Sequence, residues 1–206
     1  MENRLPLASE IANPAVSRGL RNVGIVVAGS ALVALSSHIS LPLGFTPVPL
    51  TLQPFAVVLL GMLLAPRLAA ATLGAYLLEG AMGLPVFAPG FAFGAGIAHL
   101  LGPTGGYLMS YPAAAALIAF LWQRSGRGFS AALLSAAAGN AVILLCGFAW
   151  LAVWTRGTGS FGAFGSFGAL RTAFVLAVLP FLPGDALKVV AAAAIARGLE
   201  RVRRSS

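Results

Sequence analysis

Residues 128–155 read GFSAALLSAAAGNAVILLCGFAWLAVWT, and none of them is Lys, Arg, Asp or Glu. Two longer stretches, 22–66 and 80–123, are equally free of these four residue types. A bilayer core is about 30 Å thick and needs roughly 20 apolar residues for each helical span. Residues 128–155 therefore hold one span, and each longer stretch holds about two. The sequence predicts an all-α, polytopic membrane protein.

The composition agrees with this fold class. Of 206 residues, 59% are hydrophobic and 9% are charged, and the mean hydropathy is +0.92. Soluble proteins carry about 25% charged residues. The net charge is +8, but most basic residues are arginines just beyond apolar runs and no basic stripe alternates with aromatic residues, so we expect no nucleic-acid partner. The single cysteine, Cys146, excludes an intramolecular disulfide and a metal site built from several cysteines.

We predict six transmembrane spans separated by helix-breaking Pro and Gly residues. They cover roughly 23–40, 52–65, 68–83, 105–123, 129–154 and 172–200. One membrane domain, 22–200, then lies between a polar N-terminal tail, 1–21, and a basic C-terminal tail, 201–206. The N-terminal tail lacks the apolar core of a cleavable signal peptide, so we expect none.

Two apolar but irregular segments connect the spans, the Pro-rich 42–54 and the Gly-rich 83–106. Irregular backbone does not face lipid, so both are expected at the membrane surface or against helices. A lid or cavity wall and an ordinary interfacial loop explain these segments equally well.

The basic residues predict the orientation. Six spans put both termini, the turn between spans two and three and the loop between spans four and five on one side. That side carries Arg4, Arg18, Arg21, Arg67, Arg124, Arg127, Arg197, Arg201, Arg203 and Arg204, whereas the other side carries Arg156 and Arg171. Since positive residues stay on the cytoplasmic side, we expect both termini in the cytoplasm and a multi-pass protein of the cell membrane.

Ionisable groups inside a membrane are functional candidates, because each costs at least ~2.5–3.5 kcal/mol to insert. Asp185 and Lys188 are the only aspartate and the only lysine. Pro183 and Gly184 break the preceding helix, a new helix can begin near Asp185, and a spacing of three puts both side chains on one face. They offer an acceptor and a cation to a ligand entering from outside. Mutual neutralisation in a structural ion pair remains the alternative.

Other polar or small residues in the spans carry weaker signals. Glu79 shares a helix face with small residues, which favours a structural hydrogen bond or ion pair inside the protein. His38 and His99 stand far apart, so we predict structural histidines and no metal site. Gly24, Ala28 and Ala31 put small residues on the first span. Such residues let helices approach closely, either within the chain or at a partner subunit.

Several enzyme signatures are missing from the sequence. It contains no phosphate-binding loop of the form G-x-x-x-x-G-K-[ST], no H-E-x-x-H and no G-x-S-x-G. We therefore predict neither a catalytic residue, a cofactor nor an ATPase motor in this chain.

Four short stretches occur together in one order. They are Pro47-Val48-Pro49-Leu50-Thr51-Leu52-Gln53, then Tyr76-Leu77-Leu78 with Gly80 and Gly83-Leu84-Pro85-Val86-Phe87-Ala88, then Gly102-Pro103-Thr104-Gly105-Gly106-Tyr107-Leu108, and Pro180-Phe181-Leu182-Pro183-Gly184-Asp185 with Lys188. In this order and spacing the chain resembles the BioY family, the biotin-specific substrate-capture (S) components of energy-coupling factor (ECF) transporters. The resemblance covers roughly residues 20–197.

The resemblance implies a six-helix protein that binds biotin near the outer face of the membrane. It also implies a transmembrane coupling subunit and two cytoplasmic ATPase subunits as partners, although some members of the family work alone. Gly24, Ala28 and Ala31 then become candidate contacts to the coupling subunit.

Biotin has two ureido N–H donors, an apolar chain and a carboxylate, which suits a largely apolar pocket with a few polar groups. With biotin as the ligand, our hypothesis is that Asp185 accepts a ureido N–H and Lys188 supports the carboxylate. The other candidate biotin contacts are Thr51, Gln53 and Tyr107 as polar groups, Phe87 as an apolar wall, and Gly105 and Gly106 where backbone approaches the ligand. For Thr51 and Phe87, packing within the loops is an equally good explanation. Residues 88–93 depart from the Gly/Asn-rich pattern of some relatives, so no contact is transferred to them.

Other functions stay open on the sequence alone. Within transport, these are an S component for another vitamin and a solitary biotin transporter. An intramembrane enzyme that uses Asp185 and Lys188 as acid and base, and a structural subunit without a ligand, are the readings from other classes.

Overall fold

The computed structural model describes residues 14–89, 94–158 and 166–205, and these residues are mostly helical. The helices are α2 (Pro14–His38), α3 (Gln53–Leu63), α4 (Pro66–Ala81), α5 (Ile97–Leu100), α6 (Gly105–Arg124), α7 (Phe129–Thr158), α8 (Ser166–Ala177) and α9 (Leu182–Ser205). Two strands, β1 (Ser40–Leu41) and β2 (Leu50–Thr51), pair antiparallel. The predicted fold class is confirmed, with a short hairpin inside the Pro-rich connection.

Prolines begin three of the helices. Pro54 and Pro66 lie in the first turns of α3 and α4, and Pro183 is the second residue of α9. The N–H groups of the first helical turn have no hydrogen-bond acceptor within the helix, so the missing N–H of proline costs nothing there. The proline ring also fixes φ near the helical value. These residues explain why short helices follow each other across sharp turns.

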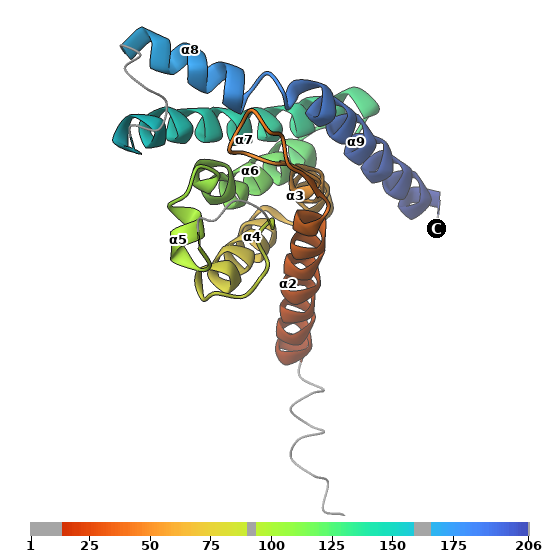
Figure 1. The fold of residues 1–206 in the computed structure, drawn as a ribbon. Helices are drawn as coiled ribbons and strands as arrows, with labels where there is room; N and C mark the ends of the chain where they lie inside the picture. Colours follow the sequence, from red (N-terminus) through yellow and green to blue (C-terminus); the bar gives the residue numbers. More distant parts are fainter. Residues whose placement is uncertain (1–13, 90–93, 159–165, 206) are drawn as a thin grey trace, which may run out of the picture.

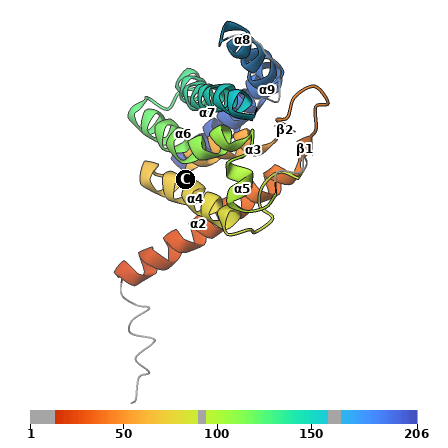
Figure 2. The same cartoon turned by 60° about the vertical axis from the view of Figure 1, so that its left-hand side comes forward.

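Helix α6 lies at the centre of the bundle. It packs against α7 on one side and against α4 and α3 on the other, an arrangement that Figures 1 and 2 show from two directions. Leu73 of α4, Ile118 of α6 and Ile143 of α7 are buried completely or nearly so in this core. Helix α8 packs against α7, and α9 packs against both α7 and α3.

The lengths of the helices decide how many of them cross a bilayer unaided. Three are long and apolar enough, Val16–His38, Gly105–Arg124 and Phe129–Arg156. The pair Arg171–Ala177 and Leu182–Val202 makes a fourth if it counts as one span. Helix α3 has 11 residues and α4 has 16, about 16 and 24 Å at 1.5 Å per residue. The count of six spans therefore stays a prediction.

The predicted span at 172–200 contains a break, as Pro183 and Gly184 indicate in the sequence, but the break lies slightly earlier, between Ala177 and Leu182. The structure divides it into α8 and α9, which meet at an angle of 46°. Pro180 has no N–H to give to the carbonyl four residues earlier, so the α8 ladder ends there. Asp185 then lies in the first turn of α9, where a carboxylate interacts favourably with the helix dipole.

Two side-chain contacts bring segments of the predicted cytoplasmic side together. Arg127, after α6, pairs with Glu200 of α9 across 2.8 Å. The Gln123 amide donates to the carbonyl of Leu64, after α3, across 3.2 Å. The turn after α3, the loop after α6 and the end of α9 therefore lie at one end of the bundle, as the charge pattern requires.

The first and last helices continue past the predicted bounds of the membrane domain, 22–200, and those bounds stay a prediction. Helix α2 begins at Pro14, inside the segment expected to be a polar tail, and α9 continues to Ser205 through the predicted C-terminal tail. Residues 1–13 lie outside the described residues, as do 90–93 in the Gly-rich segment.

Candidate ligand-binding site

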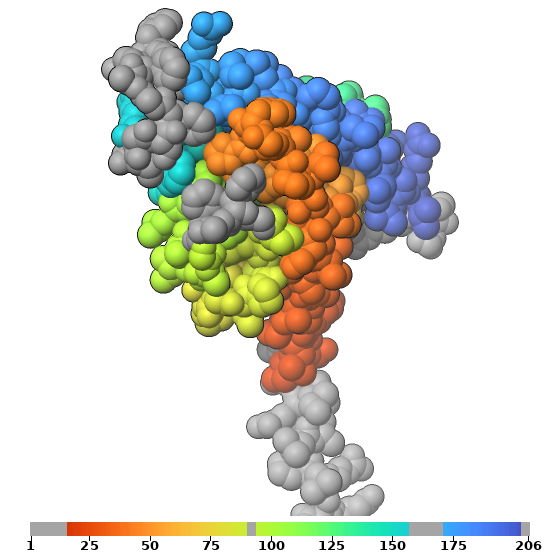
Figure 3. Space-filling view, in the orientation of Figure 1, coloured from red at the N-terminus to blue at the C-terminus, as the bar shows by residue number. Residues whose placement is uncertain are grey.

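A cavity lies between α6, α7, the start of α9 and the segment that joins α2 to α3. Its empty space is about 710 Å³ when the open solvent at its mouth is included. Its lining is Pro47, Val48, Pro49, Thr51, Gln53, Pro54, Ala88, His99, Thr104, Tyr107, Leu108, Tyr111, Ile143, Leu144, Phe181, Asp185 and Lys188. In Figure 3 the segment between α2 and α3, in orange, lies against the blue helices that cover this side.

Asp185 and Lys188 form an ion pair at the cavity wall. Lys188 Nζ donates to Asp185 Oδ1 across 2.9 Å. The side chain of Lys188 is 12% exposed and that of Asp185 is 5% exposed. A buried pair of this kind is far cheaper than either lone charge. The neutralisation that the spacing left open is therefore present. The two side chains nevertheless line the cavity, where a ligand can contact both.

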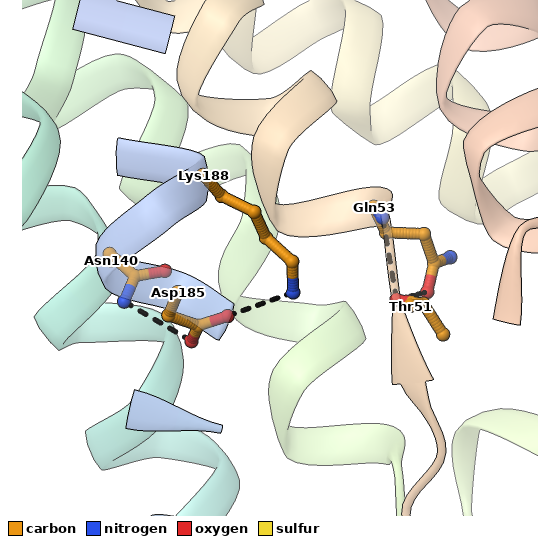
Figure 4. Close-up of polar contacts among 5 residues, drawn as sticks. All are labelled: Thr51, Gln53, Asn140, Asp185 and Lys188. Carbon is orange, nitrogen blue, oxygen red and sulfur yellow. Dashed lines mark hydrogen bonds and ion pairs between the residues drawn. The ribbon is translucent and has the colours of Figure 1, made fainter. Parts of the chain in front are cut away.

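Thr51 and Gln53 lie across the cavity from this pair (Figure 4). The Thr51 hydroxyl donates to Gln53 Oε1 across 3.1 Å and accepts from the Gln53 backbone N–H. Gln53 Nε2 donates to the Tyr76 hydroxyl, which donates to the Val86 carbonyl. The amide of Gln53 therefore has a fixed orientation, with one N–H and an Oε1 lone pair left for another partner.

Tyr107 lines the cavity, but its hydroxyl proton is already used. The hydroxyl donates to the carbonyl of Ala177 across 2.6 Å, so toward a ligand it can act only as an acceptor. The ring packs beside Phe181, with 6.2 Å between the ring centroids. Tyr107 thus ties the cavity wall to the break between α8 and α9.

Three predicted contacts lie elsewhere. Phe87 packs edge-on against Tyr76 and stacks on His99, and it is not part of the cavity lining. Gly105 and Gly106 are also outside the lining. A Cβ at Gly105 would collide with the carbonyl of Leu100, and a Cβ at Gly106 with Trp150 and the Cys146 carbonyl. These two glycines let α6 approach its neighbours closely, and a backbone contact from them to a ligand stays a prediction.

His99 reaches the cavity from the short helix α5. Burial lowers the pKa of His99 below its usual 6.5, because desolvation disfavours the imidazolium, and a backbone hydrogen bond with Gly94 offsets part of this. The ring is therefore neutral at neutral pH. Asp185 and Lys188 carry the formal charges of the described cavity lining.

Sequence reasoning missed one residue of the site. Asn140 on α7 is 7% exposed, and its Nδ2 donates to Asp185 Oδ2 across 3.3 Å (Figure 4). It is the only amide side chain in the charge-free stretch 128–155. That was the available signal, because a polar group inside a span is a functional candidate, but nothing in the spacing connects residue 140 with residue 185.

Residues of α2 and α4 bear on two further predictions. Gly24, Ala28 and Ala31 are exposed, whereas Gly29, Ser30 and Val33 face the bundle. The three predicted small residues therefore do not pack within the described chain. Glu79 accepts a hydrogen bond from the Ser30 hydroxyl across 2.8 Å, so the expected internal hydrogen bond is confirmed.

The cavity therefore combines apolar walls with one carboxylate, one ammonium, an amide and hydroxyl groups. Among the described residues no three His, Cys, Asp or Glu side chains are grouped to hold a metal ion. The arrangement suits a compact, largely apolar molecule that carries hydrogen-bond donors and an anionic group.

Comparison with known proteins gives one consistent result. Residues 7–205 match the BioY family. The chain is 39% identical to the "Probable biotin transporter BioY" of Pyrococcus horikoshii, over 87% of this chain and 96% of that protein. It is 35% identical to the "Biotin transporter BioY" of Thermotoga maritima, over 84% and 92%.

A solved structure agrees with these sequence matches. The crystal structure of the S-component for biotin from an ECF-type ABC transporter superposes with a TM-score of 0.72. Its sequence is 25% identical, and the match covers 90% of this chain and 93% of that one. The four sequence stretches that occur in the family's order, the helical bundle and these matches together show that the chain belongs to the BioY family.

Proposed function

We propose that this protein is an S component that captures biotin for uptake and is not an enzyme. The observation that carries the proposal is the cavity in which Asp185 and Lys188 face Thr51 and Gln53. Membership of a family whose relatives are biotin transporters supports it, as does the likeness to a biotin S-component.

In this proposal, Asp185 accepts a ureido N–H and Lys188 pairs with the valerate carboxylate. Ligand binding then replaces their mutual contact of 2.9 Å with two contacts to biotin. A carboxylate that accepts from N–H and an ammonium that donates to a carboxylate both form charge-assisted hydrogen bonds. Gln53 and Thr51 offer their remaining polar capacity, and Val48, Leu144 and Phe181 contact the apolar part of the ligand.

The proposal extends to partners and location. The exposed residues Gly24, Ala28 and Ala31 of α2 form a smooth surface on which another helix can pack closely. We assign this surface to the transmembrane coupling subunit, which joins the chain to two cytoplasmic ATPase subunits. The arginine-rich end of the bundle faces the cytoplasm, with both termini there and the helices in the cell membrane.

The test is biotin binding to the purified full chain in lipid nanodiscs. Asp185→Asn and Lys188→Ala are each expected to weaken binding at least tenfold, which corresponds to about 1.4 kcal/mol. Glu79→Gln is the matched control, because it neutralises an acid in a different predicted span, outside the cavity lining, whose partner Ser30 lies on α2. Thiamine and riboflavin are measured alongside.

Each outcome separates one reading from another. Selective biotin binding that both cavity variants weaken supports the site. Binding that both leave intact keeps the ligand and moves the site toward Gln53 and Tyr107. Preference for thiamine or riboflavin indicates another vitamin, and no binding to a folded sample contradicts the proposal. Biotin uptake by cells that lack coupling and ATPase subunits would identify a solitary transporter.

A further inference from the structure

Asn140 approaches the Asp185 carboxylate from a different helix than Lys188 does. Lys188 lies one turn after Asp185 on α9 and contacts Oδ1, whereas Asn140 lies on α7 and contacts Oδ2 (Figure 4). Asn140 itself is outside the cavity lining. The carboxylate is therefore held between the two helices, with one oxygen on each partner.

Neither Asp185 nor Lys188 fixes the plane of that carboxylate alone. The terminal torsion of an aspartate is broad and has no sharp rotamer preference. The ammonium of Lys188 sits on a flexible four-carbon stem that follows the carboxylate when it turns. The short amide side chain of Asn140, 7% exposed on α7, is the partner that does not move with α9.

The rest of the Asn140 side chain supports a role through Nδ2. Its Oδ1 is buried and has no hydrogen-bond partner among the described residues, and burying an unpaired acceptor costs free energy. A leucine would fill a similar volume in this apolar helix without that cost. Since a carboxylate only accepts hydrogen bonds, the amide must turn its N–H, and not its carbonyl, toward Asp185.

The geometry points to Asn140 as a positioning residue for ligand capture, one that holds Asp185 with Oδ1 toward the cavity. This inference rests on the proposed function, because it concerns the group assigned to the biotin ureido ring. Without Asn140 the carboxylate turns freely about its terminal torsion. The ligand must then order it on binding, which lowers affinity without removing any direct contact to the ligand.

The first test compares two amide-removing variants. Asn140→Leu keeps the volume and removes the hydrogen bond. Its Kd for biotin is expected to be at least ten times that of wild type. Gln123→Met is the matched control. It removes an amide that lies near the C-terminal end of α6, outside the cavity lining, and donates to the Leu64 carbonyl. It is expected to bind biotin like wild type. Both are measured as purified full-length protein in nanodiscs.

The second test is the pH profile of Asn140→Asp, which preserves shape. Two adjacent carboxyls share a proton until the pH exceeds a strongly raised pKa. Below that pH the introduced carboxyl donates its O–H to Asp185 Oδ2 and replaces the amide; above it, two carboxylates repel. The ratio of variant to wild-type Kd is therefore expected near one at about pH 5.5 and at least ten at about pH 9.

Taking this ratio cancels the other titratable groups of the cavity, His99, Tyr107, Tyr111 and Lys188, since wild type carries them too. A merely structural role predicts a ratio that does not change with pH. Binding at acid pH also proves that the same variant is folded.

The outcomes separate the inference from the function on which it rests. Wild-type affinity in Asn140→Leu, or a constant ratio in Asn140→Asp, overturns the positioning role while biotin capture stands. Failure of folded wild-type protein to bind biotin overturns both.

Discussion

The Thr46 hydroxyl donates to the carbonyl oxygen of Leu176 across 2.9 Å, in a buried contact between residues 130 positions apart. Leu176 stands four residues before Pro180, whose ring nitrogen has no hydrogen to return to that carbonyl. An unpaired buried carbonyl is expensive. The threonine thus replaces the helical hydrogen bond that the proline removes.

The carbonyl of the next residue, Ala177, also accepts a hydrogen bond from a side chain. Phe181 N–H bonds to the carbonyl of Val178 instead of Ala177, and the Ala177 carbonyl accepts from the Tyr107 hydroxyl. Thr46 belongs to the segment that supplies Pro47, Val48 and Pro49 to the cavity, and Tyr107 lines it directly. The break between α8 and α9 is therefore fastened to two walls of the binding site.

Replacement of Thr46 by valine is expected to destabilise the protein by about 1–3 kcal/mol, because it strands the Leu176 carbonyl. Thermal unfolding in detergent, followed by tryptophan fluorescence, measures the loss. Thr46→Ser keeps a hydroxyl and is the matched control. Equal melting temperatures for the valine and serine variants would contradict this account of the break.

Removal of the Lys188 ammonium alone is expected to cost more stability than removal of the whole ion pair. Lys188→Met leaves Asp185 buried without its cation, which costs about 3–5 kcal/mol for such pairs. The double variant Asp185→Asn, Lys188→Met carries no charge there and is expected to recover most of the melting temperature.

Biotin binding by the same double variant distinguishes stability from recognition. We expect a folded protein that still binds biotin weakly, since both polar contacts are lost. Restored affinity together with restored stability would show that the pair serves only folding.

Acid is expected to destabilise the fold through His99. Its folded pKa lies below the usual 6.5, so the unfolded chain takes up the proton first. The contribution of His99 to stability is thus complete above about pH 6.5 and is lost as the pH falls toward the folded pKa. His99→Phe keeps an aromatic ring against Phe87, which stacks at 5.0 Å, and removes this titration.

Melting temperatures between about pH 7 and pH 5 test the histidine. Wild type is expected to lose more than His99→Phe over this range. Parallel curves for the two proteins would show that another group causes the acid sensitivity.

A methyl group is expected to have opposite effects at two glycines. Gly106→Ala pushes a Cβ into Trp150 and the Cys146 carbonyl, so α6 and α7 must separate and the melting temperature falls. At Gly24 nothing lies within 4 Å of the added Cβ, so Gly24→Ala leaves stability unchanged or slightly higher.

A further test concerns the proposed contact between Gly24 and the coupling subunit. A larger change, Gly24→Leu, is expected to preserve biotin binding and to weaken co-purification with the coupling subunit. Undisturbed co-purification would move the contact away from this face of α2.

The sequence predicted the helical fold, the basic end and five polar residues that the structure places around one cavity, Asp185, Lys188, Thr51, Gln53 and Tyr107. Asp185 and Lys188 could be singled out because each is the only residue of its type in the sequence. Whether those residues contact biotin remains a prediction.

The misses have a common physical cause. The place of Asn140 beside Asp185 depends on how α7 lies against α9, which periodicity within either helix does not specify. The packing of Gly105 and Gly106 against Leu100, Trp150 and Cys146 was not predicted either, because a glycine pattern does not say which neighbour comes close. The angle between α8 and α9 follows from Pro180 together with Thr46 and Tyr107, and the latter two are distant in sequence.

The unequal lengths of the helices have a consequence for the surrounding lipid. Helix α6 separates α4, of 16 residues, from α7, whose apolar part has 28, or about 24 Å against about 42 Å. Each ångström of hydrophobic mismatch costs a fraction of a kcal/mol, and a long helix reduces its mismatch by tilting. The thickness of the bilayer is therefore expected to influence how far α7 tilts from the membrane normal.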